Sequence, residues 1–353
     1  MPDLTPDLCV ASEQSLIKPD ALISALPLAF DLKNIIQHAR RIATEIIHGR
    51  DNRLLVIVGP CSIHDEHAAL EYAELLKAAA TRFADELFIV MRLYFEKPRT
   101  SLGWKGLISD PRLDKSDDIN QGLQLARKIL LQVAHIGMPA ATEFLDNITP
   151  RYFADLISWS AVGARTSESQ LHREIASGLG LPVGFKNTTD GNIQIAVDGV
   201  TAARYPHSFL GVSQTGEAAI INTNGNENCH IILRGSNTAV NYTEADVKRA
   251  VTILENADLV KRVMIDCSHG NSMKDYARQR IVVADIVTQL RAGSTHIAGV
   301  MLESNLVAGR QAYDSGQPLV YGQSITDACL SWEETLPLLE QLAIAKKART
   351  DIN

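Results

Sequence analysis

The run LLVIV at Leu54–Val58 is unbroken, apolar and rich in β-branched residues, and Gly59-Pro60-Cys61 follows it directly. An apolar run without alternating polar residues is typical of a strand buried on both faces, as in a parallel sheet. The next segment, Glu66–Phe83, has apolar residues at the 3.6-residue period of a helix. A buried strand followed by a helix is the unit from which α/β folds are built. This stretch therefore predicts an α/β protein.

Seven further apolar runs follow, most of them separated by segments with helical periodicity. The runs are Leu87–Leu93, Pro139–Thr142, Leu156–Val162, Pro182–Phe185, Phe209–Val212, Val263–Ile265 and Ile297–Leu302. Helical periods are clearest at Ile119–His135, Glu244–Ala257 and Asp275–Leu290. Eight strands in roughly 300 residues fit a closed (β/α)8 TIM barrel. A doubly wound open sheet is the alternative, and the lack of a G-x-G-x-x-G after the first strand weakens it.

Two parts of the chain do not fit a plain barrel. Ala218–Thr223 and His230–Leu233 flank Asn224-Gly225-Asn226, which predicts an inserted β-hairpin at about 213–234. Residues 1–50 precede the first strand and include a helical stretch, Asp31–His48. We therefore expect residues 1–50 to be a regulatory or assembly extension and residues 51–353 to be the catalytic barrel with its hairpin.

The composition excludes several classes of protein. A net charge of −7 argues against nucleic acid as a partner, because binding a phosphate backbone needs a basic surface. The five cysteines form no C-x-x-C pair, which favours a reducing compartment over a disulfide framework. The sequence shows neither a secretory signal pattern nor an apolar run of membrane-spanning length. We therefore expect a cytoplasmic protein without a membrane partner.

Cationic residues follow the predicted strands where neutral turn residues are usual. In a (β/α)8 barrel these strand ends form the active site. The cations at or just beyond them are Arg92, Lys97, Arg99, Arg165, Lys186 and Arg234. One such cation is most often a surface charge, but a group that converges on one barrel mouth repels itself unless a multiply charged anion lies within it. Arginine binds carboxylate and phosphate oxygens in pairs, so we predict an anion-binding site.

A second set at the same rim consists of a thiol, an imidazole and two carboxylates. Its members are Cys61, His269, Glu303 and Asp327. A single buried cysteine or histidine is usually a packed residue, whereas four ligand-type side chains at one rim predict a divalent metal site. The mixed ligands accept Mn, Fe, Co, Zn or Cu, and a thiolate disfavours Mg and Ca. By contrast, Asp65 fits a helix N-cap, and Cys267 and Cys329 fit packing roles.

The motifs around these residues resemble those of the class I 3-deoxy-D-arabino-heptulosonate 7-phosphate (DAHP) synthases over essentially the whole chain. They are Gly59–Ser62, Lys97–Ser101, Gly163–Arg165, Gly184–Asn187, Leu233–Gly235, Asp266–His269, Glu303–Asn305 and Ser324–Cys329. The resemblance implies a transferase that condenses phosphoenolpyruvate (PEP) with D-erythrose 4-phosphate and water, giving DAHP and phosphate. This is the first step of the shikimate pathway of aromatic amino acid biosynthesis.

The resemblance also implies roles for individual residues. It assigns PEP binding to Arg92, Lys97, Glu143, Ala164, Arg165, Lys186 and Arg234, and erythrose 4-phosphate binding to Arg99, Thr100 and Ser101. It assigns one metal ion per subunit to Cys61, His269, Glu303 and Asp327. The residues expected to act in catalysis are Lys97, Cys61, His269 and Asp327, with Lys97 donating a proton to the new hydroxyl. The base that activates water stays open between Glu143 and a water linked to Asp327.

Members of this family are commonly inhibited by an aromatic amino acid, and we expect a homodimer or homotetramer. The resemblance places the effector site at Phe209, Gly211 and Gly180. Glycine at 211 and the run Asp266–Ser272 resemble tyrosine-inhibited members, whereas Tyr321–Ser324 resembles tryptophan-inhibited ones. We predict inhibition by tyrosine.

Two other functions fit part of the pattern. A sister octulosonate-phosphate synthase uses the same PEP chemistry on arabinose 5-phosphate, but the Lys97–Thr100 motif and the N-terminal arm favour the four-carbon sugar. A catalytically silent regulatory partner would lack some of the metal ligands or cations. This sequence lacks none of them.

Overall fold

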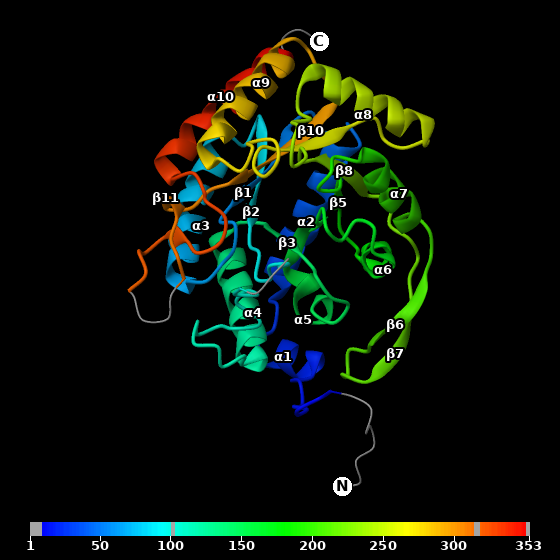
Figure 1. Cartoon of the computed structure of the whole chain (residues 1–353), viewed down its shortest axis with the longest axis vertical. Coiled ribbons are helices and arrows are strands. Elements are labelled where there is room, and N and C mark those ends of the chain that lie inside the picture. The colour runs from blue at the N-terminus through cyan, green and yellow to red at the C-terminus, as the bar shows by residue number, and fades with distance from the viewer. Residues whose placement is uncertain (1–8, 100–102, 314–317, 351–353) are drawn as a thin grey trace.

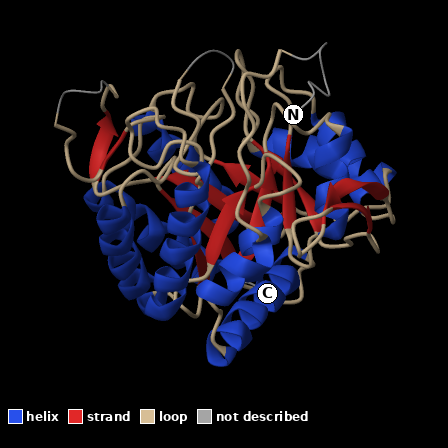
Figure 2. Ribbon diagram, turned by 90° about the horizontal axis from the view of Figure 1, so that it is seen from below, coloured by secondary structure: helices blue, strands red, loops and turns tan. Residues whose placement is uncertain are grey.

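The computed structural model describes residues 9–99, 103–313 and 318–350. Eight parallel strands close into a barrel in the order β1-β10-β9-β8-β5-β4-β3-β2. Their bounds are β1 Leu54–Gly59, β2 Leu87–Arg92, β3 Ala140–Glu143, β4 Ile157–Val162, β5 Val183–Lys186, β8 Cys229–Leu233, β9 Val263–Asp266 and β10 Ile297–Glu303. Figure 2 shows the strands at the centre of the molecule with helices around them. The predicted (β/α)8 barrel is confirmed, and the open sheet is wrong.

Helices connect the barrel strands and cover their outer face (Figure 1). They are α3 Glu66–Arg82, α4 Ile119–Ile136, α5 Pro150–Phe153, α6 Gln170–Gly178, α7 Ile193–Ala203, α8 Glu244–Asn256, α9 Gln279–Arg291 and α10 Trp332–Thr350, with short 3₁₀ turns at Ala154–Leu156 and Tyr276–Arg278. The predicted N-cap of α3 is confirmed, because the Asp65 carboxylate accepts a hydrogen bond from the Ala68 amide at 3.1 Å. Apolar side chains at helical spacing, such as Tyr72 and Leu76, are fully buried.

The barrel strands have no solvent-facing side, which explains their unbroken apolar runs. All six residues of β1 and all seven of β10 are buried. One polar layer interrupts the apolar interior, where Trp159 Nε1 donates a hydrogen bond to His230 Nε2 at 3.3 Å. Because both polar groups have a partner, this layer avoids the cost of burying an unsatisfied donor.

The prediction for the inserted hairpin was wrong in its strands. Ser208–Val212 (β6) pairs antiparallel with Ala218–Asn222 (β7), so the hairpin spans 208–222 and turns at residues 213–217 rather than at Gly225. The run His230–Leu233 belongs instead to the barrel strand β8. His230 made this run look half-polar, but its ring is buried against Trp159. Conversely, exposure alternates over Ser208–Gly211 in β6 and none of its residues is buried, as expected of a hairpin that lies over the barrel surface.

The N-terminal segment joins the barrel to this hairpin. It forms α1 (Pro19–Ala25) and α2 (Phe30–Ile47). The Tyr152 hydroxyl donates to the Ile17 carbonyl at 2.5 Å, and the Asp20 amide donates to the Gln214 carbonyl in the hairpin turn at 3.0 Å. In Figure 1 the hairpin reaches along one side of the molecule toward α1. Within the described ranges, no helix has the length and apolar character needed to cross a membrane.

The long loop after β10 folds into a small sheet of its own. Val307–Arg310 (β11) pairs with Gln323–Ser324 (β12), and Gly309 forms a bridge with Cys329. A second bridge joins Ser304 to Leu330. These contacts bring Asp327 back to the end of the barrel from which the loop started.

Candidate active site

A cavity of about 390 Å³ opens at the carboxyl ends of the barrel strands. The predicted site residues that line it are Arg92, Lys97, Arg99, Glu143, Ala164, Arg165, Lys186, Arg234, His269, Glu303 and Asp327. Cys61 lies fully buried beneath them. The two remaining predicted substrate residues, Thr100 and Ser101, fall outside the described residues. The strand-end rule therefore correctly predicted that side chains more than 200 residues apart in the sequence line one cavity.

The metal-ligand types form one cluster at the floor of this cavity. Ligand atoms of Cys61, Glu303 and Asp327 all lie within 4.8 Å of one another. Cys61 Sγ is 3.5 Å from Asp327 Oδ2, and His269 Nε2 is 3.8 Å from Glu303 Oε1. Three acidic or thiol side chains this close repel each other once ionised. Thiolate, imidazole and carboxylate together suit a divalent transition metal, so the residues present fit such an ion.

The close packing of charged and ionisable groups shifts the pKa values of Cys61 and Asp327 in opposite directions. Burial, together with the Glu303 carboxylate, raises the pKa of the Cys61 thiol to about 11, and Lys97 opposes this. Burial opposes ionisation of Asp327 too, but Lys97 and His269 outweigh it and lower the pKa of that carboxyl to about 2. The Lys97 ammonium lies 3.1 Å from Cys61 Sγ. Metal binding at this cluster must therefore displace the thiol proton.

Asp266 organises the neighbouring part of the site, a role that the sequence did not reveal. Its fully buried carboxylate accepts from Lys186 Nζ at 2.8 Å and lies 2.9 Å from His269 Nδ1. Burial opposes its charge, but His269 and Lys186 hold the pKa of Asp266 well below its usual value. His269 also has a left-handed backbone (φ +55°), which is uncommon for a residue with a side chain. Asp266 thus fixes both the imidazole and a lysine that lines the cavity.

Arg92 ties the metal-ligand loop to the strand ends. Its Nε donates to the Pro60 carbonyl at 3.1 Å, and its Nη2 donates to the Cys61 carbonyl at 3.3 Å and to Glu303 Oε1 at 3.0 Å. The arginine is almost fully buried. Gly59 makes this approach possible, because a Cβ there would lie 2.8 Å from the Arg92 carbonyl oxygen.

Arg234 is the cation best placed to receive an anion. Its side chain is 6% exposed, and its Nε and Nη1 have no hydrogen-bond partner in the described part of the chain. Arg165 lies close enough for the two charges to interact, and burial is the largest cause of the lowered pKa of Arg234. A buried guanidinium with unused donors is costly unless a ligand supplies acceptors.

The cavity contains two cations that the strand-end rule missed. Lys274 and Arg310 line its outer part. Lys274 lies eight residues beyond β9 and Arg310 ends β11, whereas the rule considers only the first residues after a barrel strand. Two further residues, Thr189 and Ser272, add hydroxyl groups. No periodic signal in the sequence marks these loop positions.

A pair of partly buried carboxyl groups, Glu96 and Asp146, is next in the chain to residues that line this cavity and a second one. Glu96, adjacent to Lys97, lies within hydrogen-bonding reach of the Asp146 carboxyl, and Thr149 Oγ1 is 3.4 Å from Glu96 Oε2. Burial, and after it the charge of Asp146, raises the pKa of Glu96 to about 8. Asn147, the next residue after Asp146, lines the second cavity.

Glutamine at position 96 is expected to stabilise the protein at pH 8 to 9, by on the order of 2 kcal/mol, and to change its stability little near pH 5. The unfolded glutamate loses its proton near pH 4.5, whereas the native one keeps it to about pH 8. Rising pH between these values therefore lowers the free energy of unfolding of the unaltered protein, and glutamine removes that decrease. Urea denaturation at several pH values measures the free energy of unfolding of both proteins. Glu74→Gln, at an exposed position on α3, is the control, and an unchanged pH slope in Glu96→Gln would contradict the prediction.

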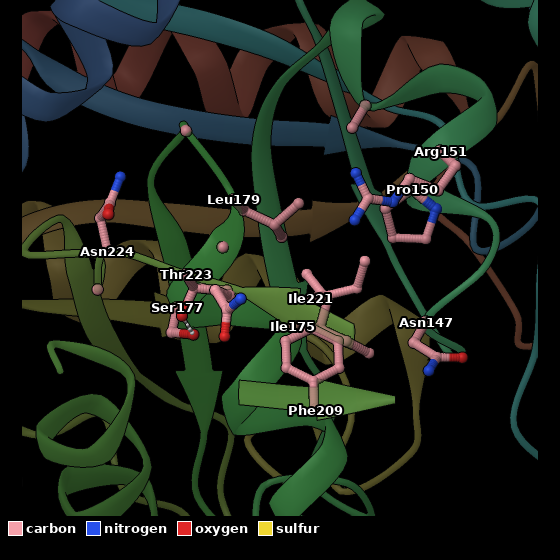
Figure 3. Close-up of a pocket in the computed structure, with 15 residues that line it drawn as sticks. Asn147, Pro150, Arg151, Ile175, Ser177, Leu179, Phe209, Ile221, Thr223 and Asn224 are labelled. Carbon is pink, nitrogen blue, oxygen red and sulfur yellow. Dashed lines mark hydrogen bonds between the residues drawn. The ribbon is translucent and has the colours of Figure 1, made fainter. Parts of the chain in front are cut away.

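The second cavity, of about 370 Å³, lies between the hairpin and α5–α6. Figure 3 shows the side chains of Leu179, Ile221 and Pro150 around it, with the Arg151 guanidinium at its edge. Phe209 and Gly180, two of the predicted effector residues, line it. Gly211, the third, is not among the residues that line it, but a Cβ at Gly211 would lie 2.7 Å from Cγ1 of Ile221, which does line it. The apolar wall and single cation suit a ligand that has an apolar body and a carboxylate.

Comparison with known proteins gives one consistent result. The pattern of the DAHP synthetase I family matches residues 30–340. The chain is 54% identical to the Phe-sensitive phospho-2-dehydro-3-deoxyheptonate aldolase of Escherichia coli K12, over 97% of this chain and 98% of that one. It is 51% identical to the Tyr-sensitive enzyme of the same strain, over 94% of each chain. Relatives named Trp-sensitive match almost as well.

A solved structure agrees with these sequences. The phospho-2-dehydro-3-deoxyheptonate aldolase of Francisella tularensis superposes with a TM-score of 0.94 at 51% identity, covering 96% of this chain and 99% of that one. The match extends through the barrel, the hairpin and the loops that carry the site. The chain therefore belongs to the DAHP synthetase I family, a family of metalloenzymes.

Proposed function

We propose that this protein condenses PEP with D-erythrose 4-phosphate and water to give DAHP and inorganic phosphate. The observation that carries the proposal is the convergence of two features in one cavity: a buried arginine with unused donors beside a second arginine, and a cluster of thiol, imidazole and carboxylates. The first feature suits the phosphate and carboxylate of PEP. The second suits an ion next to the aldehyde of the sugar.

The reaction assigns a task to each group of residues. Carbon 3 of PEP attacks the aldehyde carbon to form the new C–C bond, water adds at carbon 2, and the C–O bond to phosphate breaks. Arg165, Lys186 and Arg234 hold the PEP anion, and Arg99 with Thr100 and Ser101 takes the sugar phosphate. Lys97, beside the Cys61 thiol, donates the proton that neutralises the new alkoxide. Arg92 holds Cys61 and Glu303 in place as well as facing PEP.

The metal site is proposed at Cys61, His269, Glu303 and Asp327. A divalent ion bound there supplies Lewis-acid polarisation of the aldehyde oxygen. Asp266 holds the His269 ring so that its Nε2 faces Glu303. Transition metals suit this mixed set, and Mn, Fe, Co, Zn and Cu are all compatible with it.

The test is phosphate release from PEP by the purified protein, with and without erythrose 4-phosphate and with and without a chelator. We expect release only when both substrates are present, loss of release with the chelator, and recovery on adding Mn²⁺. Arabinose 5-phosphate in place of the four-carbon sugar is expected to give no release. Phosphate release that needs no sugar, or that the chelator leaves unchanged, would contradict the proposal.

We further infer that tyrosine inhibits the enzyme from the cavity beside the hairpin. Relatives named Phe-, Tyr- and Trp-sensitive match this chain at 54%, 51% and 52% identity, so the choice rests on position 211. Glycine there places no side chain against Ile221, which is part of the cavity wall, and Arg151 supplies a partner for the amino acid carboxylate.

Serine at position 211 is expected to raise the half-inhibitory concentration of tyrosine about tenfold, an effect on the order of 1.4 kcal/mol, and to favour phenylalanine instead. Its Cβ would lie 2.7 Å from Ile221 Cγ1, so the Ile221 side chain would have to shift and the cavity wall would change shape. Inhibition curves with each aromatic amino acid measure the change. Ala218→Ser, on the exposed part of the same hairpin, serves as control. The inference fails if phenylalanine inhibits the unaltered protein more strongly than tyrosine does.

We propose that residues 1–50 and the hairpin serve regulation and assembly, and that the protein is a homodimer or homotetramer. The hydrogen bond from the Asp20 amide in the arm to the Gln214 carbonyl in the hairpin turn supports a joint role. Leu210 and Ile220, which face each other across the hairpin, are 80% and 71% exposed, and a second copy of the chain is the partner that we propose for them. Light scattering tests this. The five unpaired cysteines support a reducing, cytoplasmic setting.

A further inference from the structure

Tyr94 occupies a fully buried position directly behind the arginine that joins the metal-ligand residues. It lies two residues after Arg92, so both side chains project from the same face of the extended chain. The Arg92 guanidinium carbon lies 3.6 Å from the centre of the Tyr94 ring, which is stacking distance. The Tyr94 carbonyl also accepts a hydrogen bond from the Ile63 amide at 2.9 Å. Tyr94 therefore contacts both Arg92 and the loop that carries Cys61.

The ring, not the hydroxyl, makes the contact that matters. The Tyr94 hydroxyl has no hydrogen-bond partner among residues 9–99, 103–313 and 318–350. The guanidinium, in contrast, uses its edge for Pro60, Cys61 and Glu303, and leaves one flat face for the ring. A cation buried away from water is stabilised by an aromatic face more than by an aliphatic side chain. That face also restricts the guanidinium to one plane, in which its donors meet all three acceptors.

We propose that Tyr94 is a positioning residue for the metal centre and the PEP site, acting through the stacked guanidinium of Arg92. Arg92 joins the carbonyl of Cys61 to the carboxylate of Glu303, so its orientation sets the separation of two proposed metal ligands. Residues that orient ligands in this way change metal affinity about 10- to 100-fold when they are replaced. The inference rests on the proposed metal centre and adds a residue to it.

The experiment is a Co²⁺ titration of the metal-free protein, followed by the thiolate-to-cobalt charge-transfer absorption. Tyr94→Phe keeps the ring and is expected to bind within about twofold of the unaltered protein, whereas Tyr94→Leu is expected to bind about tenfold more weakly. Steady-state assays are expected to show a raised KM for PEP in Tyr94→Leu and an unchanged KM for erythrose 4-phosphate.

Phe95→Leu is the matched control. Phe95 is the next residue, is equally buried, and packs against Phe153 rather than against a cation. Both leucine variants lose aromatic packing and stability, but only Tyr94→Leu is expected to change cobalt affinity. Equal cobalt binding by the two leucine variants would overturn the proposal, as would a Tyr94→Phe defect as large as that of Tyr94→Leu.

Two further arms keep the test decisive. If Tyr94→Leu does not fold, Arg92→Lys replaces it, because lysine keeps the charge but cannot join three acceptors, and normal cobalt affinity in that variant overturns the proposal. If the unaltered protein itself gives no thiolate-to-cobalt band, the metal centre is wrong and the role of Tyr94 is excluded with it. That result is distinct from a defect seen only in the variants.

Discussion

Alanine at position 61 is expected to abolish metal-dependent turnover while the barrel stays folded. Cys61 is fully buried and its sulfur lies next to Asp327 and Lys97. Lewis-acid stabilisation of the developing alkoxide contributes several kcal/mol, and each 1.4 kcal/mol is a factor of about ten in rate. We therefore expect the rate to fall by at least about 10³-fold, since alanine removes the sulfur ligand altogether.

Three measurements separate this prediction from a loss of folding. Metal content after dialysis is expected to fall well below one ion per chain, circular dichroism is expected to stay unchanged, and added Mn²⁺ is expected not to restore the rate. Cys229→Ala removes another buried thiol, in β8 and away from the cavity, and is expected to stay active. A fully active Cys61→Ala protein that binds metal normally would exclude this cysteine as a ligand.

Glutamine at position 234 is expected to lower kcat/KM for PEP by about 10² to 10³-fold, because each lost hydrogen bond from a charged group costs about 1.5 to 3 kcal/mol. The Arg234 guanidinium has two unused donors in the described structure, and PEP brings the acceptors. The KM for erythrose 4-phosphate and the metal content are expected to stay as they are. The measurement is a pair of saturation curves, one for each substrate.

Thermal stability gives a second test of Arg234. The substitution that lowers kcat/KM is expected to raise the Tm of the ligand-free protein. Arg234 is a nearly buried cation close to Arg165, so the ligand-free protein holds it at a cost. Arg234→Gln is therefore expected to raise the Tm in the absence of ligand. Inorganic phosphate is expected to raise the Tm of the unaltered protein but not that of the variant. Arg249→Gln, on the exposed side of α8, is the control. A lower Tm together with equal losses for both substrates would indicate a structural role instead.

The sequence predicts the barrel well because both faces of each strand are buried, so the apolar runs stand out against the amphipathic helices. It failed where that rule does not hold. His230 is the one polar residue in the run that forms barrel strand β8, and it led us to assign that run to the hairpin. The apolar run Phe209–Val212 was assigned to the barrel, although it forms a hairpin strand. Only the three-dimensional pairing of β6 with β7 distinguishes them.

The sequence predicted those residues of the candidate site that lie at or just beyond the ends of barrel strands. Arg92, Glu143 and Lys186 end their strands, so one rule found all three. Asp266 was visible as a strand end too, but its hold on Lys186 and His269 depends on distances that the chain order does not contain. Lys274 comes from a loop and Arg310 ends β11, a strand outside the barrel, so the rule for barrel strand ends finds neither. The stack of Tyr94 on Arg92 needed coordinates as well.

The loop after β10 has a consequence for how the protein matures. Cys61 and Asp327 are separated by 266 positions in the chain, and Asp327 follows β11 and β12, whose pairing returns the loop to the barrel end. During synthesis, which proceeds from the N-terminus, all eight strands of the barrel and three of the four proposed ligand side chains are made before this carboxylate leaves the ribosome. The proposed centre is therefore complete only in chains translated beyond Asp327, and fragments that stop earlier hold the Cys61 thiol without its carboxylate partner.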